Sequence, residues 1–138
     1  MKTTVEKAYK AYVALDAAKV STLETAERQT VTSLWYALTE IGEKHKALID
    51  KANKNLMPAG YEELVLKGQY TPGEAAHLRR MQVKYEAEVE AVVAPEGEKE
   101  VEVDITQKLS LATVEKIIAE NGWSMSVHRD LAIVIDPK

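Results

Sequence analysis

Apolar side chains recur at alternating steps of three and four residues between positions 31 and 52. The stripe consists of Val31, Leu34, Leu38, Ile41, His45, Leu48 and Ala52. This is the a and d spacing of a helical seam, and the first proline of the chain comes only at Pro58. The sequence therefore predicts one helix from about Leu23 to Asn53, roughly 45 Å long at 1.5 Å per residue. Such a helix must bury its seam against another helix, in its own chain or in a second one.

Composition places the chain among ordered globular proteins. It has 138 residues, of which 46% are hydrophobic and 29% charged, so we expect a single helical interaction domain over residues 1–138. No apolar run approaches the 18 residues or so of a membrane span. The chain has no cysteine, so we expect no disulfide framework and no thiolate chemistry. The first seven residues turn polar where a secretory signal would become apolar, which favours the cytoplasm.

The charge of the chain is unevenly distributed. The formal net charge is −4, and eight acidic residues but one basic residue, Lys99, fall between Glu86 and Asp104. This balance makes nucleic acid an unexpected partner. A small basic cluster stands against it, formed by His77, Arg79, Arg80 and Lys84. It supports one alternative function, a small nucleic-acid-associated regulatory protein.

Two further helices are predicted beside the long one. The first covers about residues 3–18, where apolar residues share one helical face, and Ser21 or Thr22 could cap the helix that follows. The second covers about residues 72–93. It begins with a capping box, Thr71 and Glu74, and Pro72 takes the first helical position. Its apolar face consists of Leu78, Met81, Tyr85, Val89 and Val92.

The connections around these helices are less definite. Residues 53–60 contain the asparagine, proline and glycine that end a helix. Residues 61–70 fit either a short strand at 64–66 or a helical turn. We expect Pro95, Glu96 and Gly97 to turn the chain.

The last third of the chain carries the β signals. Val101, Val103 and Ile105 alternate with acidic residues, which predicts a strand over 100–108. A helix follows over about 110–121. Residues 127–136 fit a strand or a helix, and their β-branched content favours a strand parallel to the first. If they are helical, the first strand needs residues 64–66 or another subunit as its partner.

The residues that could support catalysis do not form a recognisable site. The three histidines lie on different segments without metal-ligand spacing, and we expect His77 and His128 at the surface. Ser124, Ser126, His128 and Asp130 are too close in sequence to converge as a triad. His45 either fixes the register or senses pH inside the seam, or the stripe reaches the surface there, which is the interpretation we favour. We predict no enzyme, no cofactor and no metal, hence no catalytic, cofactor-binding or metal-ligating residues.

In order along the chain, these pieces resemble a known family. The features are the short helix through Ala14 and Leu15, the long helix ending in residues 46–51, the acidic helix ending at 86–93, the 100–105 segment, and the closing segments 109–114 and 131–135. This pattern is similar to a family of small proteins of tailed phages and prophages that has no assigned activity. The resemblance implies a phage origin and favours a helical tail, and it transfers no functional residues.

Together these observations predict an α+β fold, mainly α, with a long central helix, two helices packed on it and a small β element near residues 100–108. The expected function is a non-enzymatic, phage- or prophage-encoded protein–protein interaction or virion-assembly component. It would act in the host cytoplasm or the virion, through helical faces and strand pairing, with a protein partner or by self-association as an oligomer. The candidate interaction residues are Val31, Leu34, Trp35, Tyr36, Leu38, Ile41, His45, Tyr85, Val101, Val103 and Ile105.

Overall fold

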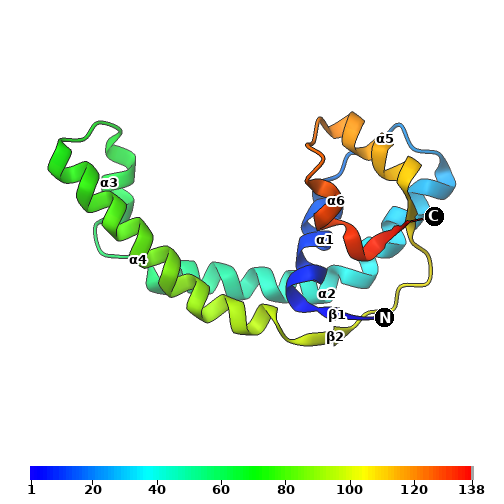
Figure 1. The fold of residues 1–138 in the computed structure, drawn as a ribbon, viewed down its shortest axis with the longest axis horizontal. Helices are drawn as coiled ribbons and strands as arrows, with labels where there is room; N and C mark the ends of the chain where they lie inside the picture. The colour runs from blue at the N-terminus through cyan, green and yellow to red at the C-terminus, as the bar shows by residue number, and fades with distance from the viewer. Residues whose placement is uncertain (138) are drawn as a thin grey trace. The chain divides into compact units, whose positions relative to one another are not determined.

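The computed structural model describes residues 1–137, and most of them are helical (Figure 1). The helices are α1 (Val5–Ala17), α2 (Thr25–Leu56), α3 (Tyr61–Lys67), α4 (Pro72–Gly97), α5 (Leu111–Asn121) and α6 (Val127–Asp130). A 3-10 turn, η1 (Ala132–Val134), follows α6. The strands are β1 (Lys2–Thr4), β2 (Glu100–Glu102), β3 (Leu109–Ser110) and β4 (Ile135–Asp136). The predicted mainly helical class with a minor β element is confirmed.

The long helix predicted from the seam is also confirmed. The prediction ran from Leu23 to Asn53, and α2 runs without interruption from Thr25 to Leu56. Its start is held by Glu24 and Glu27, since the Glu24 amide donates to the Glu27 carboxylate at 3.0 Å. Ser21 or Thr22 was the expected cap, but both residues bond instead to Glu120 of α5.

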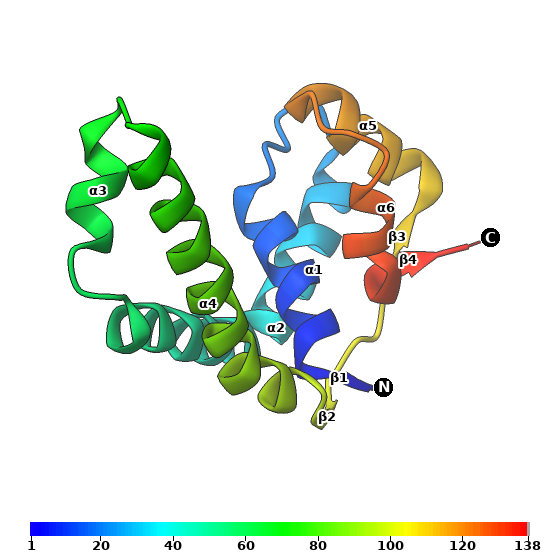
Figure 2. The ribbon, with the colours of Figure 1, turned by 60° about the vertical axis from the view of Figure 1, so that its left-hand side comes forward.

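The chain divides into two compact units, and α2 runs through both of them. The terminal unit comprises residues 1–46 and 97–138, and the middle unit comprises residues 47–96. The hydrophobic core belongs to the terminal unit, where α1, the first part of α2, α5 and the tail surround it (Figure 2). Its members are Ala8, Ala11, Tyr12, Leu15, Leu23, Val31, Leu34, Leu38, Val103, Leu109, Val114, Ile117, Leu131, Val134 and Ile135. The prediction of one domain over 1–138 stays a prediction.

The strand predicted over 100–108 is much shorter than expected. Only residues 100–102 form β2, which pairs antiparallel with β1 in the register Lys2 to Glu102. The Ile105 amide donates to the Val103 carbonyl at 3.2 Å, so the backbone turns there and the strand cannot continue. The partner within the chain is β1 and not residues 64–66, and pairing with another subunit stays a prediction. Residues 3 and 4, which lie in the predicted first helix, belong to β1 in the structure.

The tail combines both conformations that its sequence allowed. Residues 127–130 are helical, 132–134 form the 3-10 turn, and only Ile135 and Asp136 are strand. The predicted parallel strand–helix–strand arrangement around α5 is present, because β4 pairs parallel with β3. The partner strand was wrong, since β4 lies on Leu109 and Ser110 and not on 101–105. Helix α5 is as predicted, with the Ser110 hydroxyl accepting from the Thr113 amide at 3.1 Å.

The middle unit contains the end of α2, helix α3 and most of α4. The ambiguous 61–70 segment is helical, and α3 lies between Gly60 and Gly68, which both have a φ of 78°. That left-handed conformation suits glycine because it has no Cβ. The predicted capping box of α4 is confirmed, with reciprocal hydrogen bonds of 3.2 and 3.1 Å between Thr71 and Glu74. The turn expected at residues 95–97 was wrong, because α4 passes through Pro95 and ends at Gly97.

Candidate functional site

Most of the predicted seam is buried inside the terminal unit. Val31, Leu34 and Leu38 are buried, with Leu38 at 0% exposure, and Ile41 is half-buried. Tyr12 of α1 covers this part of α2 and lies against Gly42, where any side chain would overlap its ring. Gly42 therefore allows α1 to approach α2 closely. Val31, Leu34 and Leu38 belong to the protein's own core, and Ile41 packs against it.

The two aromatic residues next to the seam have different environments. The Trp35 ring stacks on Tyr12 with centroids 6.4 Å apart, and its indole N–H donates to Asp16 Oδ1 at 3.0 Å. Tyr36 contacts Trp35 edge-on at 5.0 Å but remains 69% exposed. Trp35 packs against the core, whereas Tyr36 lies on the surface because it is one residue further around the helix.

His45 is buried, with 4% exposure, so the interpretation that the seam reaches the surface there was wrong. The Tyr9 ring contacts it edge-on at 4.9 Å. A Cβ placed on Gly97 would lie 3.8 Å from His45 Cε1, so the chain closely approaches the ring from that side too. A residue of α1 and the end of α4 thus cover a histidine whose sequence position alone suggested an exposed edge.

The predicted interaction residues of the β element also contact their own chain. Val103 is buried in the core, and Val101 and Ile105 are half-buried against it. The amino-terminal ammonium donates to Glu102 Oε1 at 2.6 Å and to the Val103 carbonyl at 3.1 Å. One edge of β2 is therefore paired with β1 of the same chain.

Tyr85 is the candidate that lies in the middle unit. Its hydroxyl donates to the Asn53 carbonyl at 2.5 Å, and its ring meets Tyr61 edge-on at 5.3 Å. One side chain of α4 thus connects the end of α2 with the start of α3. Tyr85 stabilises the middle unit, and it is half-buried.

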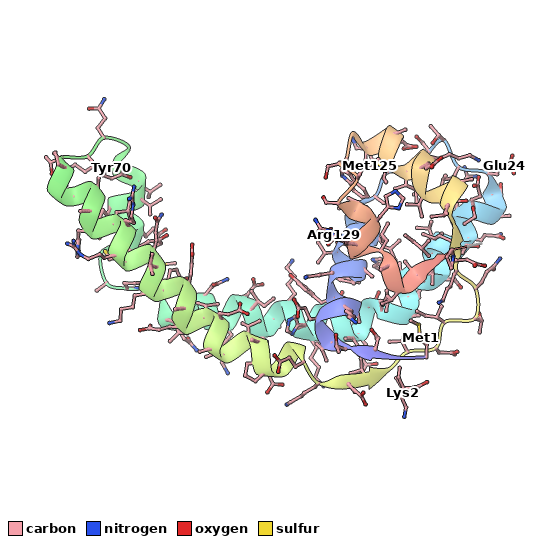
Figure 3. All side chains as sticks on the ribbon, viewed as in Figure 1. Met1, Lys2, Glu24, Tyr70, Met125 and Arg129 are labelled. Carbon is pink, nitrogen blue, oxygen red and sulfur yellow. The ribbon has the colours of Figure 1, made fainter. Side chains whose placement is uncertain are left out.

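The middle unit buries very little. Of residues 47–96, all of which the structure describes, only Ala52 is buried. Large apolar side chains are exposed instead, and they are Met57, Val65, Leu66, Val83 and Val92. Leu66 of α3 is 77% exposed. Figure 3 shows side chains, Tyr70 among them, projecting from α3, α4 and the connection between them. Sequence reasoning missed this surface, because each helix has an apolar stripe and only the tertiary structure shows which stripe is covered.

A groove of about 450 Å³ lies in the terminal unit between α1 and the segment that leads into α6. Apolar side chains line most of it, including Val13, Trp123 and Val127, and Lys10 and Asp130 provide the charges. It is open to solvent. Met125, labelled in Figure 3, belongs to the same segment and is exposed. No local pattern predicts this groove, because its two walls are more than 100 residues apart in the chain.

In the terminal unit, the carboxylates of Glu27 and Glu120 each accept several hydrogen bonds. Glu27 accepts hydrogen bonds from the Thr113 hydroxyl at 2.5 Å, the Glu24 amide and Lys116, and these lower its pKa to about 2. Glu120 accepts from the Thr22 amide at 2.7 Å and from Ser21, and these donors lower its pKa. In both cases donated hydrogen bonds favour the charged form.

These two carboxylates have a structural role. Each lies on the surface and joins a helix to a segment more than 80 residues away. Their donors already occupy them, so the lowered pKa values follow from folding contacts and indicate no catalytic acid. Ser21 and Thr22, which were considered as helix caps, donate hydrogen bonds to the Glu120 carboxylate instead.

The residues considered for catalysis form no hydrogen-bonded triad in the described part of the chain. The hydroxyls of Ser124 and Ser126 bond to each other at 2.5 Å, and Nε2 of His128 is buried without a hydrogen-bond partner. Within residues 1–137, no three His, Cys, Asp or Glu side chains are arranged to hold a metal ion. His77 is exposed, as expected, whereas His128 is half-buried and so differs from the surface position we expected.

Comparison with known protein families, with curated proteins and with solved structures gives no match. Over the described residues, no helix combines the length and the apolar character that crossing a membrane requires.

Proposed function

We propose that this protein is a non-enzymatic interaction module and that its middle unit is the surface that binds another protein. The observation that carries the proposal is the contrast in burial between the units. Residues 47–96 bury one side chain and expose five large apolar ones, among them Leu66 and Val83, whereas the longer terminal unit exposes the same number and contains the whole core. Exposed apolar surface on a helical unit is typical of a docking face.

The resemblance to small proteins of tailed phages and prophages gives this module its expected setting. The proposed role is virion assembly or the binding of a host or phage protein, in the host cytoplasm or on the particle. Burial of helical faces would supply the affinity. Because the seam residues of α2 are already used in the terminal unit, the proposal moves from that seam to α3 and α4.

The test combines co-purification with hydrogen exchange on the full chain. A partner recovered with the tagged protein should slow amide exchange in residues 47–96 more than in residues 1–46. Leu66→Lys should weaken the complex, whereas Met125→Lys, a similarly exposed position in the terminal unit, should not. Protection confined to the terminal unit would contradict the proposal.

One observation favours the nucleic-acid alternative. His77, Arg80 and Lys84 line one open hollow of about 390 Å³ in the middle unit. Glu88 belongs to the same hollow, with its carboxylate 3.9 Å from Lys84 Nζ, which reduces the attraction for phosphate. Binding to DNA that falls steeply with salt, and that Lys84→Ala weakens, would favour this alternative over protein binding.

A further inference from the structure

The side of α4 opposite to Tyr85 carries its own regular stripe. The residues follow one another at steps of four and three, and they are Ala76, Arg80, Val83, Ala87, Glu90 and Ala94. At 3.6 residues per turn, they lie within about 40° of one line along the helix. All are exposed except Ala94, which is half-buried, and Val83 is 64% exposed. We call this set the outer face of α4.

The opposite side of the helix is engaged within the unit. Tyr85 bonds to Asn53 and contacts Tyr61, and Leu78, Met81 and Val89 on the same side are half-buried. Most of the outer face is therefore uncovered within the middle unit, and Arg80 at its edge also lines the hollow that includes Leu56 and Pro58. The outer face includes an exposed valine, so leaving it in water costs free energy.

The order of residues on the outer face is symmetric about position 85. Val83 and Ala87 lie two residues on either side, Arg80 and Glu90 five residues, and Ala76 and Ala94 nine residues. A second copy of α4 running antiparallel, with the two-fold axis at residue 85, would place Val83 against Ala87 and Arg80 against Glu90. Both ends of the stripe would then pair alanine with alanine, which allows two helices to approach closely.

The charges of the whole helix follow the same order. Basic residues precede Tyr85 and acidic residues follow it, the basic ones being His77, Arg79, Arg80 and Lys84 and the acidic ones Glu86, Glu88, Glu90 and Glu96. Glu74, an acidic residue in the basic half, already pairs with Lys67 and caps its own helix. Antiparallel helices bring opposite halves together, whereas parallel helices would bring like charges together.

We propose that the partner of the outer face is a second copy of this chain, bound antiparallel through α4 with Arg80 of each copy beside Glu90 of the other. The proposal rests on the proposed function, because it names the partner of the middle unit. An isologous contact of this kind closes as a dimer. A partner of different sequence would have no need of a stripe that is its own complement.

The test exchanges the two charges. Arg80→Glu gives an acidic outer face and Glu90→Arg gives a basic one, so each variant repels its own copy. Sedimentation velocity on the full chain should show a dimer for the wild type. For each variant alone, the dissociation constant of the dimer should be at least about tenfold higher. An equal mixture of the two variants should form a heterodimer, and the Arg80→Glu/Glu90→Arg double variant should dimerise again.

Matched controls separate this contact from a general effect of charge. Lys51→Glu changes an exposed lysine of α2 in the same unit, and Glu115→Arg changes an exposed glutamate of α5. Both should leave the dimer unchanged. Ala87→Glu, at the centre of the outer face, should abolish it while the circular dichroism stays that of the wild type.

Two outcomes would overturn the inference. One is a wild-type protein that stays monomeric at several hundred micromolar, and the other is a pair of variants that do not associate when mixed. In either case the proposed function stands if a different partner still protects residues 47–96 from exchange. It falls as well only if protection is confined to the terminal unit.

Discussion

The two units of this protein use similar helices in different ways. The terminal unit holds all of the hydrophobic core, and its polar contacts join segments far apart in sequence, as Glu27 joins Thr113 and Glu120 joins Thr22. The middle unit has one buried side chain, and most of its polar contacts are local, such as the Thr71–Glu74 capping box. The difference teaches that amphipathic stripes alone do not distinguish a core from a binding surface. Stability should therefore be concentrated in the terminal unit and association in the middle unit.

The largest expected effect comes from a cavity in the terminal unit. Leu38→Ala should lower the free energy of unfolding by about 2–5 kcal/mol, because the side chain is fully buried and leaves a void. Leu66→Ala in the middle unit should change it by less than about 0.5 kcal/mol, since that leucine is exposed. Urea denaturation of both variants measures the difference. Equal losses would mean that the two units are not distinguished by burial.

A smaller effect should follow from overpacking at Gly42. Gly42→Ala should destabilise by about 1–3 kcal/mol, because the new methyl group would overlap the Tyr12 ring. Gly73→Ala, in the first turn of α4, meets no atom within 4 Å and should be neutral or stabilising by up to about 1 kcal/mol. Thermal denaturation distinguishes the two. A neutral Gly42→Ala would show that α1 does not depend on this close approach.

The third effect is confined to the middle unit. Tyr85→Phe removes the hydrogen bond to the Asn53 carbonyl and should cost about 0.5–1.5 kcal/mol. Hydrogen exchange should become faster in residues 47–96 and stay unchanged in the core of the terminal unit. Tyr36→Phe, on a largely exposed ring, is the control and should alter neither region. Faster exchange throughout the chain would mean that the two units unfold together.

The smallest effect concerns pH. The pKa of Glu27 is lowered from 4.5 to about 2, so its contribution to stability is present above about pH 4.5 and is lost as the pH falls towards 2. Glu27→Gln should remove this part of the acid sensitivity, whereas Glu115→Gln, at an exposed position on α5, should not. Denaturant midpoints measured between pH 5 and pH 2 test this. Identical acid profiles for wild type and Glu27→Gln would contradict the role of the Thr113 and Lys116 contacts.

The sequence by itself determined the local structure. The heptad spacing defined α2 within about three residues, the Thr71–Glu74 box defined the start of α4, and Ser110 with Asn121 defined α5. These signals act between residues that are three or four positions apart, so the chain encodes them without reference to the rest of the fold. The short strand over 100–102 and the passage of α4 through Pro95 were not predicted. Where a helix or strand ends depends on the backbone that packs against it in space, which a local pattern does not describe.

Only the tertiary structure decided which surfaces are buried. His45 of α2 was expected at the surface and is buried against Tyr9 and Gly97. Val83 lies on α4, which also has an apolar face, and it is exposed. The pairing of β2 with the amino terminus depends on a contact about 100 residues apart in the chain. Burial is a property of two segments together, and a periodic pattern describes only one of them. The sequence therefore predicts which residues form an apolar face, and the fold determines whether that face becomes core or surface.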